Sequence, residues 1–324
     1  MYSLKDKNPL RDFPREVGVL IFASFFVAVG FGIIAPTLPL FARSFGVNNA
    51  QVGSIISAFA FARFASGLIS GKLVDIFGER MVYTFGVAFV SISSAAAAMA
   101  QSYGQLLIFR AAGGLGSSMF SVAAGSLLLR VTSDNQRGRA QSLYNGSFLI
   151  GMVGGPVIGG ALSGISLRAP LAIYAFLLAV SSISAALLLR GSQLAAKPVN
   201  ASEKTSIRTA LALKPYRIAL VISFSTGFIL FGMGRSIVPL FMVEDMDAST
   251  TFMGVGFTLA SIANGALLLR AGRLSDEKGR RFVAVIGSSA LFISTLLLLL
   301  TFNKWIFMPA MSLRVANRVL FTNW

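Results

Sequence analysis

Long apolar runs separated by short polar segments dominate this sequence. Nine runs reach about 20 residues, the length at which an α-helix crosses a hydrocarbon core of roughly 30 Å. They lie at 17–42, 51–73, 81–100, 105–129, 142–163, 169–189, 217–243, 251–271 and 282–302. The runs are uniformly apolar and lack the two-residue alternation of a membrane β-strand. The pattern therefore predicts an all-α polytopic membrane protein.

The composition supports a membrane protein and removes most enzyme chemistry. Charged residues make up only 12% of the chain, whereas a soluble domain carries about a quarter. Cysteine and histidine are absent from the sequence, which excludes disulfides, thiolate nucleophiles, Ser-His-Asp triads and imidazole metal sites. Nothing outside the apolar runs could form a site that pairs a catalytic acid with a base. We therefore predict that the protein is not an enzyme and uses no cofactor or metal.

The net charge of +16 follows from membrane topology. With a cytoplasmic N-terminus, the inside segments hold 20 lysines and arginines, whereas the outside segments hold three, Arg43, Arg168 and Lys304. This asymmetry is the positive-inside signal. It explains the basic charge without a nucleic-acid partner, and we predict a multi-pass protein of the cell membrane. The first run is too long for a signal peptide and is expected to be a retained helix.

Two groups of residues recur along the chain in the same order. Phe31, Gly32, Pro39, Leu40 and Phe41 recur at an offset of 200 as Phe231, Gly232, Pro239, Leu240 and Phe241. Gly71, Leu73, Asp75, Gly78 and Arg80 recur at an offset of 201 as Gly272, Leu274, Asp276, Gly279 and Arg281. We infer a tandem duplication in which both copies start inside. The predicted parts are a six-helix bundle at 1–190, a cytoplasmic linker at 191–216 and an incomplete bundle at 217–324.

Short inner loops follow the second predicted helix of each copy, reading GKLVDIFGER at 71–80 and GRLSDEKGRR at 272–281. Glycines permit a tight turn between helix ends, and a carboxylate there can accept from a helix N-terminus or pair with a flanking arginine. Both loops resemble the G-x-x-x-D-x-x-G-R-R signature of the major facilitator superfamily. The resemblance implies a major facilitator-type bundle with a gating latch. Its residues would be Gly71, Asp75, Gly78, Arg80, Gly272, Asp276, Gly279 and Arg281.

Further motifs narrow the resemblance to the drug:proton antiporter branch. RAAGG at 110–114 is similar to the family's R-x-x-Q-G motif, and GFGIIAPTLP at 30–39 looks like the first helix of that branch. GMVGGPVIGG at 151–160 is similar to the antiporter motif G-x-x-x-G-P-x-x-G-G. Its glycines, four apart, leave a groove for a neighbouring helix, and its proline bends the helix. The packing residues are Gly151, Gly155, Pro156, Gly159 and Gly160.

Three arginines lie at membrane depth, where such a charge costs about 2.5 to 3.5 kcal/mol and marks a functional pathway by default. All 12 acidic residues fall in tails, loops or helix ends, so these guanidinium groups lack an internal counter-ion. We expect a cavity that favours an anionic, zwitterionic or neutral polar solute over a cation. The alternative is that the arginines snorkel or bind backbone carbonyls. The expected cavity residues are Arg63, Arg110, Arg235, Asn264 at the duplicate position of Arg63, and the mouth prolines Pro36 and Pro39.

The resemblance implies a secondary active transporter that exports a small organic solute in exchange for protons by alternating access. Arginine does not titrate in a useful range, so a proton carrier must be a carboxylate, and the predicted membrane interior has none. Three interpretations stay open. Asp75 or Asp276 serves at the cytoplasmic edge, the carrier lies in missing sequence, or transport is not proton-driven.

The end of the chain differs from the expected second copy. Helices at about 105–190 should recur near 306–391, and after Met311 the chain carries Arg314 and Arg318 on one helical face, so the tail cannot span. We therefore expect a transporter truncated in its C-terminal half, with three helices and a non-spanning tail after the linker. Two alternatives remain: a solute uptake symporter with the same fold, and a non-transporting remnant or regulatory membrane protein.

Overall fold

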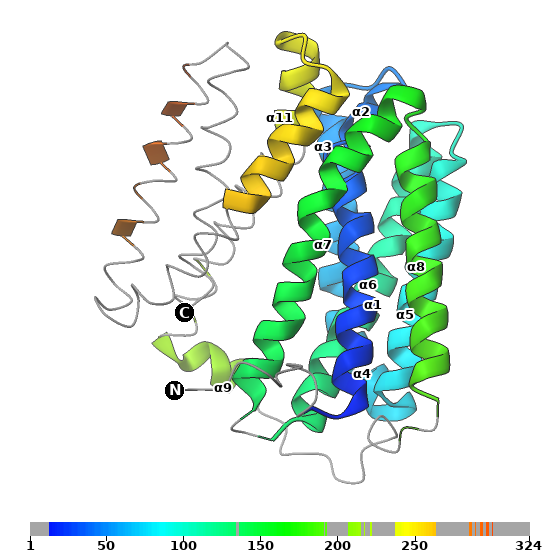
Figure 1. The fold of residues 1–324 in the computed structure, drawn as a ribbon, viewed down its shortest axis with the longest axis vertical. Helices are drawn as coiled ribbons and strands as arrows, with labels where there is room; N and C mark the ends of the chain where they lie inside the picture. The colour runs from blue at the N-terminus through cyan, green and yellow to red at the C-terminus, as the bar shows by residue number, and fades with distance from the viewer. Residues whose placement is uncertain are drawn as a thin grey trace, which may run out of the picture. The chain divides into compact units, whose positions relative to one another are not determined.

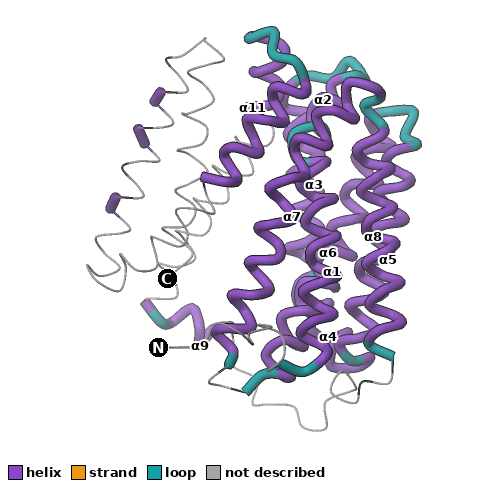
Figure 2. Tube along the Cα trace, viewed as in Figure 1, coloured by secondary structure: helices purple, strands orange, loops and turns teal. Residues whose placement is uncertain are grey.

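The computed structural model describes residues 13–133, 136–190, 192, 207–214, 217, 221 and 237–263, together with 285–286, 289, 292–293, 296–297 and 300. Every regular element within these residues is a helix (Figures 1 and 2). The elements are α1 (Arg15–Ile34), α2 (Leu38–Arg43), α3 (Asn49–Ala65), α4 (Gly67–Phe77), α5 (Glu79–Ala98), α6 (Tyr103–Val131), α7 (Arg137–Ile165), α8 (Ala169–Leu188), α9 (Ile207–Ala212), α11 (Val238–Leu240) and the π-helical turn η2 (Phe241–Asp245). A further apolar helix covers Thr250–Ala263.

Five of these helices, α1, α5, α6, α7 and α8, are long and apolar enough to cross a membrane. The helices α3 and α4 pass the same test as a pair, bent by 46° at their junction. Helices therefore lie at all six apolar runs predicted before the linker, which confirms the all-α polytopic fold. The runs predicted at 217–243, 251–271 and 282–302 lie partly outside the described residues, as does most of the predicted linker.

The first predicted run, 17–42, is two helices instead of one. A turn at 35–37 separates α1 from α2. Pro36 and Pro39 lack a backbone N–H, so a continuous helix would lose hydrogen bonds at both positions. The Thr37 hydroxyl donates to the carbonyl of Ile33 at 3.2 Å, which satisfies one of the carbonyl groups that a helix end leaves unpaired.

The second predicted run is also interrupted, at Ser66 between α3 and α4. The Ser66 hydroxyl donates to the carbonyl of Ala62 at 2.7 Å, the back-bonding that bends helices. The turn from α4 to α5 is made by Gly78, whose φ of 79° lies in the left-handed region that favours glycine. This glycine therefore has a conformational reason to occupy the predicted latch loop.

The chain separates into two compact units that interleave in sequence. Unit 1 holds residues 1–31, 58–151 and 171–201, and unit 2 holds 32–57, 152–170 and 202–324. In unit 1, α5 and α6 meet backbone to backbone, because a Cβ on Gly86 would lie 2.8 Å from the carbonyl oxygen of Gly116. The Ser91 hydroxyl of α5 donates to the carbonyl of Ala175 in α8 at 2.7 Å. Hydroxyl-to-carbonyl bonds of this kind satisfy polar groups that lipid cannot.

In unit 2, the end of α1 packs against the second half of α7. A Cβ on Gly32 would lie 3.1 Å from the Cα of Gly155, and one on Gly159 would overlap the carbonyl of Ile33. A Cβ on Gly160 would likewise overlap the carbonyl of Thr250. Small residues therefore allow these helix backbones to approach closely, as in membrane helix packing generally.

Candidate functional site

Arg63 lies near the end of α3, one turn before the bend, and reaches across to α6. Its Nη1 donates to the Ser117 hydroxyl at 2.7 Å and its Nη2 to the Ser121 hydroxyl at 2.8 Å. The Ser121 hydroxyl in turn donates to the carbonyl of Ser117 at 2.6 Å, which fixes its position. Arg63 itself is an exposed residue. The guanidinium group is therefore held in one plane by two neutral hydroxyls.

Arg110 of α6 is only 3% exposed, and its guanidinium lies over an aromatic ring of α3. Its Cζ is 4.7 Å from the centroid of the Phe59 ring, a cation–π contact. Its Nε and Nη1 are buried without a hydrogen-bond partner in the described part of the chain. A buried guanidinium with two unpaired nitrogens is costly, so this position differs from an ordinary packing residue.

Two glycines bring the helices that carry these arginines together. A Cβ on Gly114 would lie 2.9 Å from the Cβ of Ala62 and 3.0 Å from the backbone nitrogen of Arg63. A Cβ on Gly113 would lie 3.6 Å from the Phe59 ring of α3 and 2.8 Å from the Ser93 hydroxyl of α5. The spacing of 110, 114, 117 and 121 places all four α6 positions on one helical face. Both predicted cavity arginines of the first bundle are therefore on the α3–α6 contact.

The signal for the partners of Arg63 was present in the sequence. Ser117 and Ser121 lie four residues apart and continue the α6 face that starts at Arg110. A serine pair of that spacing is common in membrane helices, so it identifies a partner only once the helix on the opposite side is known. Phe59, one turn before Arg63 on α3, is identified as a partner of Arg110 only by the structure.

The predicted latch loop contains Glu79, a buried residue to which the sequence pattern assigns no role. Glu79 begins α5, is 1% exposed and lies 3.0 Å from Arg130 at the end of α6. The Ser126 hydroxyl also donates to Glu79, at 3.1 Å. This glutamate occupies a position where the signature carries arginine. The buried ion pair of this loop therefore joins α5 to α6 and does not involve Asp75.

The predicted gating residues of this loop have different surroundings. Asp75 is exposed and makes no hydrogen bond or ion pair with any residue that the structure describes. Gly71 has open space around the position of a Cβ. The Arg80 Nη2 donates to the carbonyl of Ala186 in α8 at 3.4 Å. Arg80 thus contacts α8, while Asp75 is available to a group outside these residues.

The α7 motif forms a strip of close helix contacts. In unit 1, a Cβ on Gly151 would lie 2.8 Å from the Cβ of Ala28 in α1. In unit 2, Gly155 and Gly159 contact the end of α1, and the carbonyl of Pro156 lies against Gly254. Pro156 is inside α7 and buried. The glycines therefore bring α7 against its neighbours, as a small-residue groove requires.

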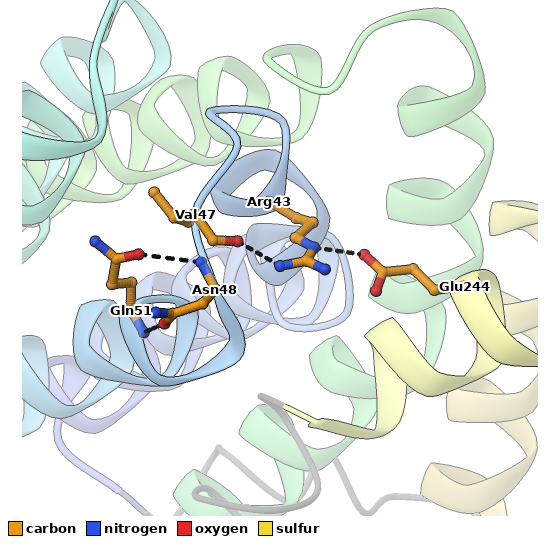
Figure 3. A network of polar contacts seen from close by, with 5 residues as sticks. All are labelled: Arg43, Val47, Asn48, Gln51 and Glu244. Carbon is orange, nitrogen blue, oxygen red and sulfur yellow. Dashed lines mark hydrogen bonds and ion pairs between the residues drawn. The ribbon is translucent and has the colours of Figure 1, made fainter.

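An ion pair within unit 2 connects α2 to η2 (Figure 3). The Arg43 Nε donates to the Glu244 Oε1 at 2.9 Å, and both side chains are more than a third exposed. Arg43 Nη1 also donates to the carbonyl of Val47, and Asn48 and Gln51 exchange bonds that cap the start of α3. The predicted mouth prolines Pro36 and Pro39 are buried beside this region of the chain. Arg43 is thus oriented by its own loop toward Glu244.

Six predicted site residues lie outside the described part of the chain. They are the second-copy latch residues Gly272, Asp276, Gly279 and Arg281 and the cavity residues Arg235 and Asn264. Their roles stay predictions. Among the residues that the structure describes, no cluster of acidic side chains could hold a metal ion.

Comparisons with known proteins identify relatives of this sequence and fold. The sequence profile of the Major Facilitator Superfamily matches residues 20–321. The quinolone resistance protein NorA of Staphylococcus aureus (strain MRSA252) is 26% identical over 172 residues, which are 51% of this chain and 44% of that protein. An uncharacterized MFS-type transporter of Methanocaldococcus jannaschii is 24% identical over 278 residues, 84% of this chain and 71% of that one. The chain thus spans less than half the length of NorA.

Solved structures share the fold at low sequence identity. A bacterial homolog to the human lysosomal transporter Spinster, in an inward-facing and unoccupied conformation, aligns with a TM-score of 0.71 at 17% identity, over 98% of this chain and 75% of that one. A POT family transporter in complex with a thioalcohol-conjugated peptide aligns with a TM-score of 0.76 at 13% identity, over 96% and 82%. Both comparisons agree with the helical membrane fold.

Proposed function

Because this chain belongs to the Major Facilitator Superfamily, we propose that it is a secondary active transporter that exports a small organic solute in exchange for protons. It acts by alternating access and lies in the plasma membrane with its N-terminus in the cytoplasm. The excess of lysine and arginine in the predicted inner segments supports this orientation. The relative named for quinolone resistance makes quinolones the first solutes to test.

The observation that carries export by antiport is the glycine strip of α7. A Cβ on Gly32 would lie 3.1 Å from the Cα of Gly155, and Gly159 lies against the backbone at Ile33. Backbone atoms meet at these glycines, so the end of α1 and the second half of α7 approach closely. A close helix contact of this kind leaves little room for water or protons to pass while a transporter changes state. This is the physical role we assign to the antiporter-type motif.

Alternating access requires contacts that break during the cycle. The exposed Arg43–Glu244 pair is suited to that role, because an exposed ion pair contributes only about 0.2 to 1 kcal/mol. Asp75, exposed and without a partner in the described residues, is the proton-carrying carboxylate that we assign to the predicted cytoplasmic edge. The buried Glu79–Arg130 pair, in contrast, holds α5 to α6 throughout the cycle.

The test is transport by the purified full chain in liposomes with an imposed pH gradient. Antiport predicts that a fluorescent quinolone accumulates when the lumen is acidic, because protons leave as the solute enters. Protein-free liposomes with the same gradient correct for passive partition. Accumulation only with an acidic exterior would identify an uptake symporter instead. Accumulation that ignores the gradient in both directions would contradict proton coupling.

A further inference from the structure

We propose that Arg63 is the anion-binding residue of the solute path, taking the carboxylate, sulfonate or phosphate group of an organic anion or zwitterion. Arg110, whose guanidinium group lies over the Phe59 ring, supplies a second positive charge. The inference rests on the proposed transport function and names the substrate class of that site. It is argued from the hydrogen bonds, charges and positions of residues on the α3–α6 contact.

The hydrogen bonds of Arg63 leave most of its binding capacity unused. A guanidinium group has five N–H donors in a fixed fork, and Ser117 and Ser121 take one donor from each terminal nitrogen. The remaining three donors have no partner among the described residues. Because the serines hold the plane in place, little side-chain freedom is lost when a ligand binds. A carboxylate is the ligand that such a fork binds in two parallel bonds.

The charge of Arg63 is not neutralised by any described residue. The two ion pairs of the described chain, Arg43–Glu244 and Arg130–Glu79, lie at helix ends and involve other arginines. Hydroxyl groups accept hydrogen bonds from a guanidinium but do not cancel its charge. Arg63 lies near the middle of the span formed by α3 and α4, where an unpaired charge is most expensive. A charge kept there without a counter-ion is available for an anionic solute.

Arg110 adds to the positive potential at the same place. Its position on α6 is one helical turn, or about 6 Å, from Gly114, which contacts the backbone of Arg63. Its Nε and Nη1 have no hydrogen-bond partner among the residues that the structure describes, and the Phe59 ring covers its guanidinium. The two arginines therefore act on one region in a medium of low dielectric, which repels an organic cation.

The competing explanation is that Arg63 is a structural residue whose hydrogen bonds hold α3 against α6. Such a role needs only hydrogen bonds, which glutamine can donate. Loss of these bonds would weaken the binding of anions and cations alike. An anion site needs the charge, so its loss would weaken anion binding alone. Replacement by glutamine and by lysine therefore separates the two explanations.

The experiment measures dye binding to the purified full chain in detergent by fluorescence anisotropy at pH 8. Fluorescein and rhodamine 123 share a xanthene ring system and carry opposite charge, so their difference reports charge selection. We expect the unmodified chain to bind fluorescein at least about ten-fold more tightly than rhodamine 123. Arg63→Gln should weaken fluorescein binding about ten-fold or more, with Arg63→Lys intermediate. It should leave rhodamine 123 binding unchanged or make it tighter, because the charge that is removed repels a cation. Arg190→Gln, at an exposed position after α8, is the control and should change neither.

A second variant keeps the charge of Arg63 but removes the two serine hydroxyls that hold its guanidinium group in place. Ser117→Ala with Ser121→Ala should weaken fluorescein binding less than Arg63→Gln does, and size-exclusion profiles confirm that each variant is folded. Three results would overturn the inference: tighter binding of rhodamine 123, equal fluorescein binding by the chain and by Arg63→Gln, or no fluorescein binding at millimolar dye. Solute flux measured on the same preparation separates this failure from failure of the transport function.

Discussion

Arg43 and Glu244 lie 201 positions apart in the sequence, and their side chains form an ion pair of 2.9 Å. That separation is one residue more than the offset of 200 at which the Pro-Leu-Phe sequence at 39–41 recurs at 239–241, and each residue follows one of these two sequences. The pair therefore joins near-equivalent points of the two predicted copies. Two identical copies would carry the same charge at equivalent positions and would repel each other there. The opposite charges of Arg43 and Glu244 give an attraction instead.

Breaking this pair should loosen the region around the α1–α2 turn. A cysteine replacing Thr37, which is 1% exposed, reports opening because the chain has no other cysteine. In this background Arg43→Glu or Glu244→Arg should raise the maleimide labelling rate by up to about five-fold, since an exposed pair contributes about 1 kcal/mol at most. The doubly exchanged variant should restore the slow rate. Failure of the double exchange to restore it would show that the pair does not hold this region.

Glu79 should tolerate the arginine of the family signature poorly. Glu79→Arg places a second guanidinium against Arg130 in a buried position, whereas Arg130→Ala leaves a buried carboxylate without its counter-ion. Loss of one partner from a buried pair costs about 3 kcal/mol. We expect both variants to lower the melting temperature in detergent, with Glu79→Arg the lower of the two. The combination Glu79→Arg with Arg130→Glu should recover part of the loss.

An equal melting temperature for the unmodified chain and Glu79→Arg would contradict this account of the latch loop. Arg190→Ala is the matched control, because it removes an arginine from an exposed helix end. It should leave the melting temperature unchanged.

The α5–α6 contact should depend on glycine at one position of α6 and not at another. A Cβ on Gly116 would overlap the backbone oxygen of Gly86 and lie 3.0 Å from a methyl group of Val90, so Gly116→Ala must push the helices apart. Such overpacking costs about 1 to 3 kcal/mol. Gly125 on the same helix has open space around it, and Gly125→Ala should stabilise the helix by about 0.5 to 1 kcal/mol. Thermal unfolding of the two variants gives the comparison, and equal effects would refute the packing argument.

Single cysteines in the cysteine-free chain test the proposed orientation. Gln101→Cys and Ser166→Cys lie at predicted outer turns, and Ser133→Cys and Ser192→Cys lie at predicted inner segments. A membrane-impermeant maleimide added to intact cells should label the first two only, and permeabilised cells should show labelling at all four. The opposite pattern would place the N-terminus outside.

Much of the fold could be predicted from the sequence, because hydropathy directly reports contact with lipid. The six apolar runs before the linker are all helical, but the breaks at Pro36 and Ser66 were not predicted. Proline and serine occur in many unbroken membrane helices, and their effect depends on which carbonyl groups they leave or bind. Hydropathy averaged over about 19 residues does not detect an interruption of three residues, as at 35–37, or of one residue, as at Ser66.

In the candidate site, the sequence identifies the charged residues but not their partners. Arg63 and Arg110 were identified as unpaired charges at membrane depth, and the described residues provide no carboxylate for either. Their partners depend on how α3 and α6 are rotated toward each other, which no single-helix pattern contains. Glu79 stands at a signature position that carries arginine, and its ion pair with Arg130 depends on the contact between α5 and α6, which the sequence of one loop does not contain.

Counterflow through liposomes that contain the full chain tests the central claim, that this protein carries a solute by alternating access. Liposomes are loaded with unlabelled quinolone and diluted into a trace of labelled quinolone without an ion gradient. A carrier exchanges the two, so we expect the labelled solute to accumulate transiently above its equilibrium level, and Arg63→Gln to reduce the overshoot. A time course that rises only to equilibrium, identical to that of protein-free liposomes, would contradict the claim.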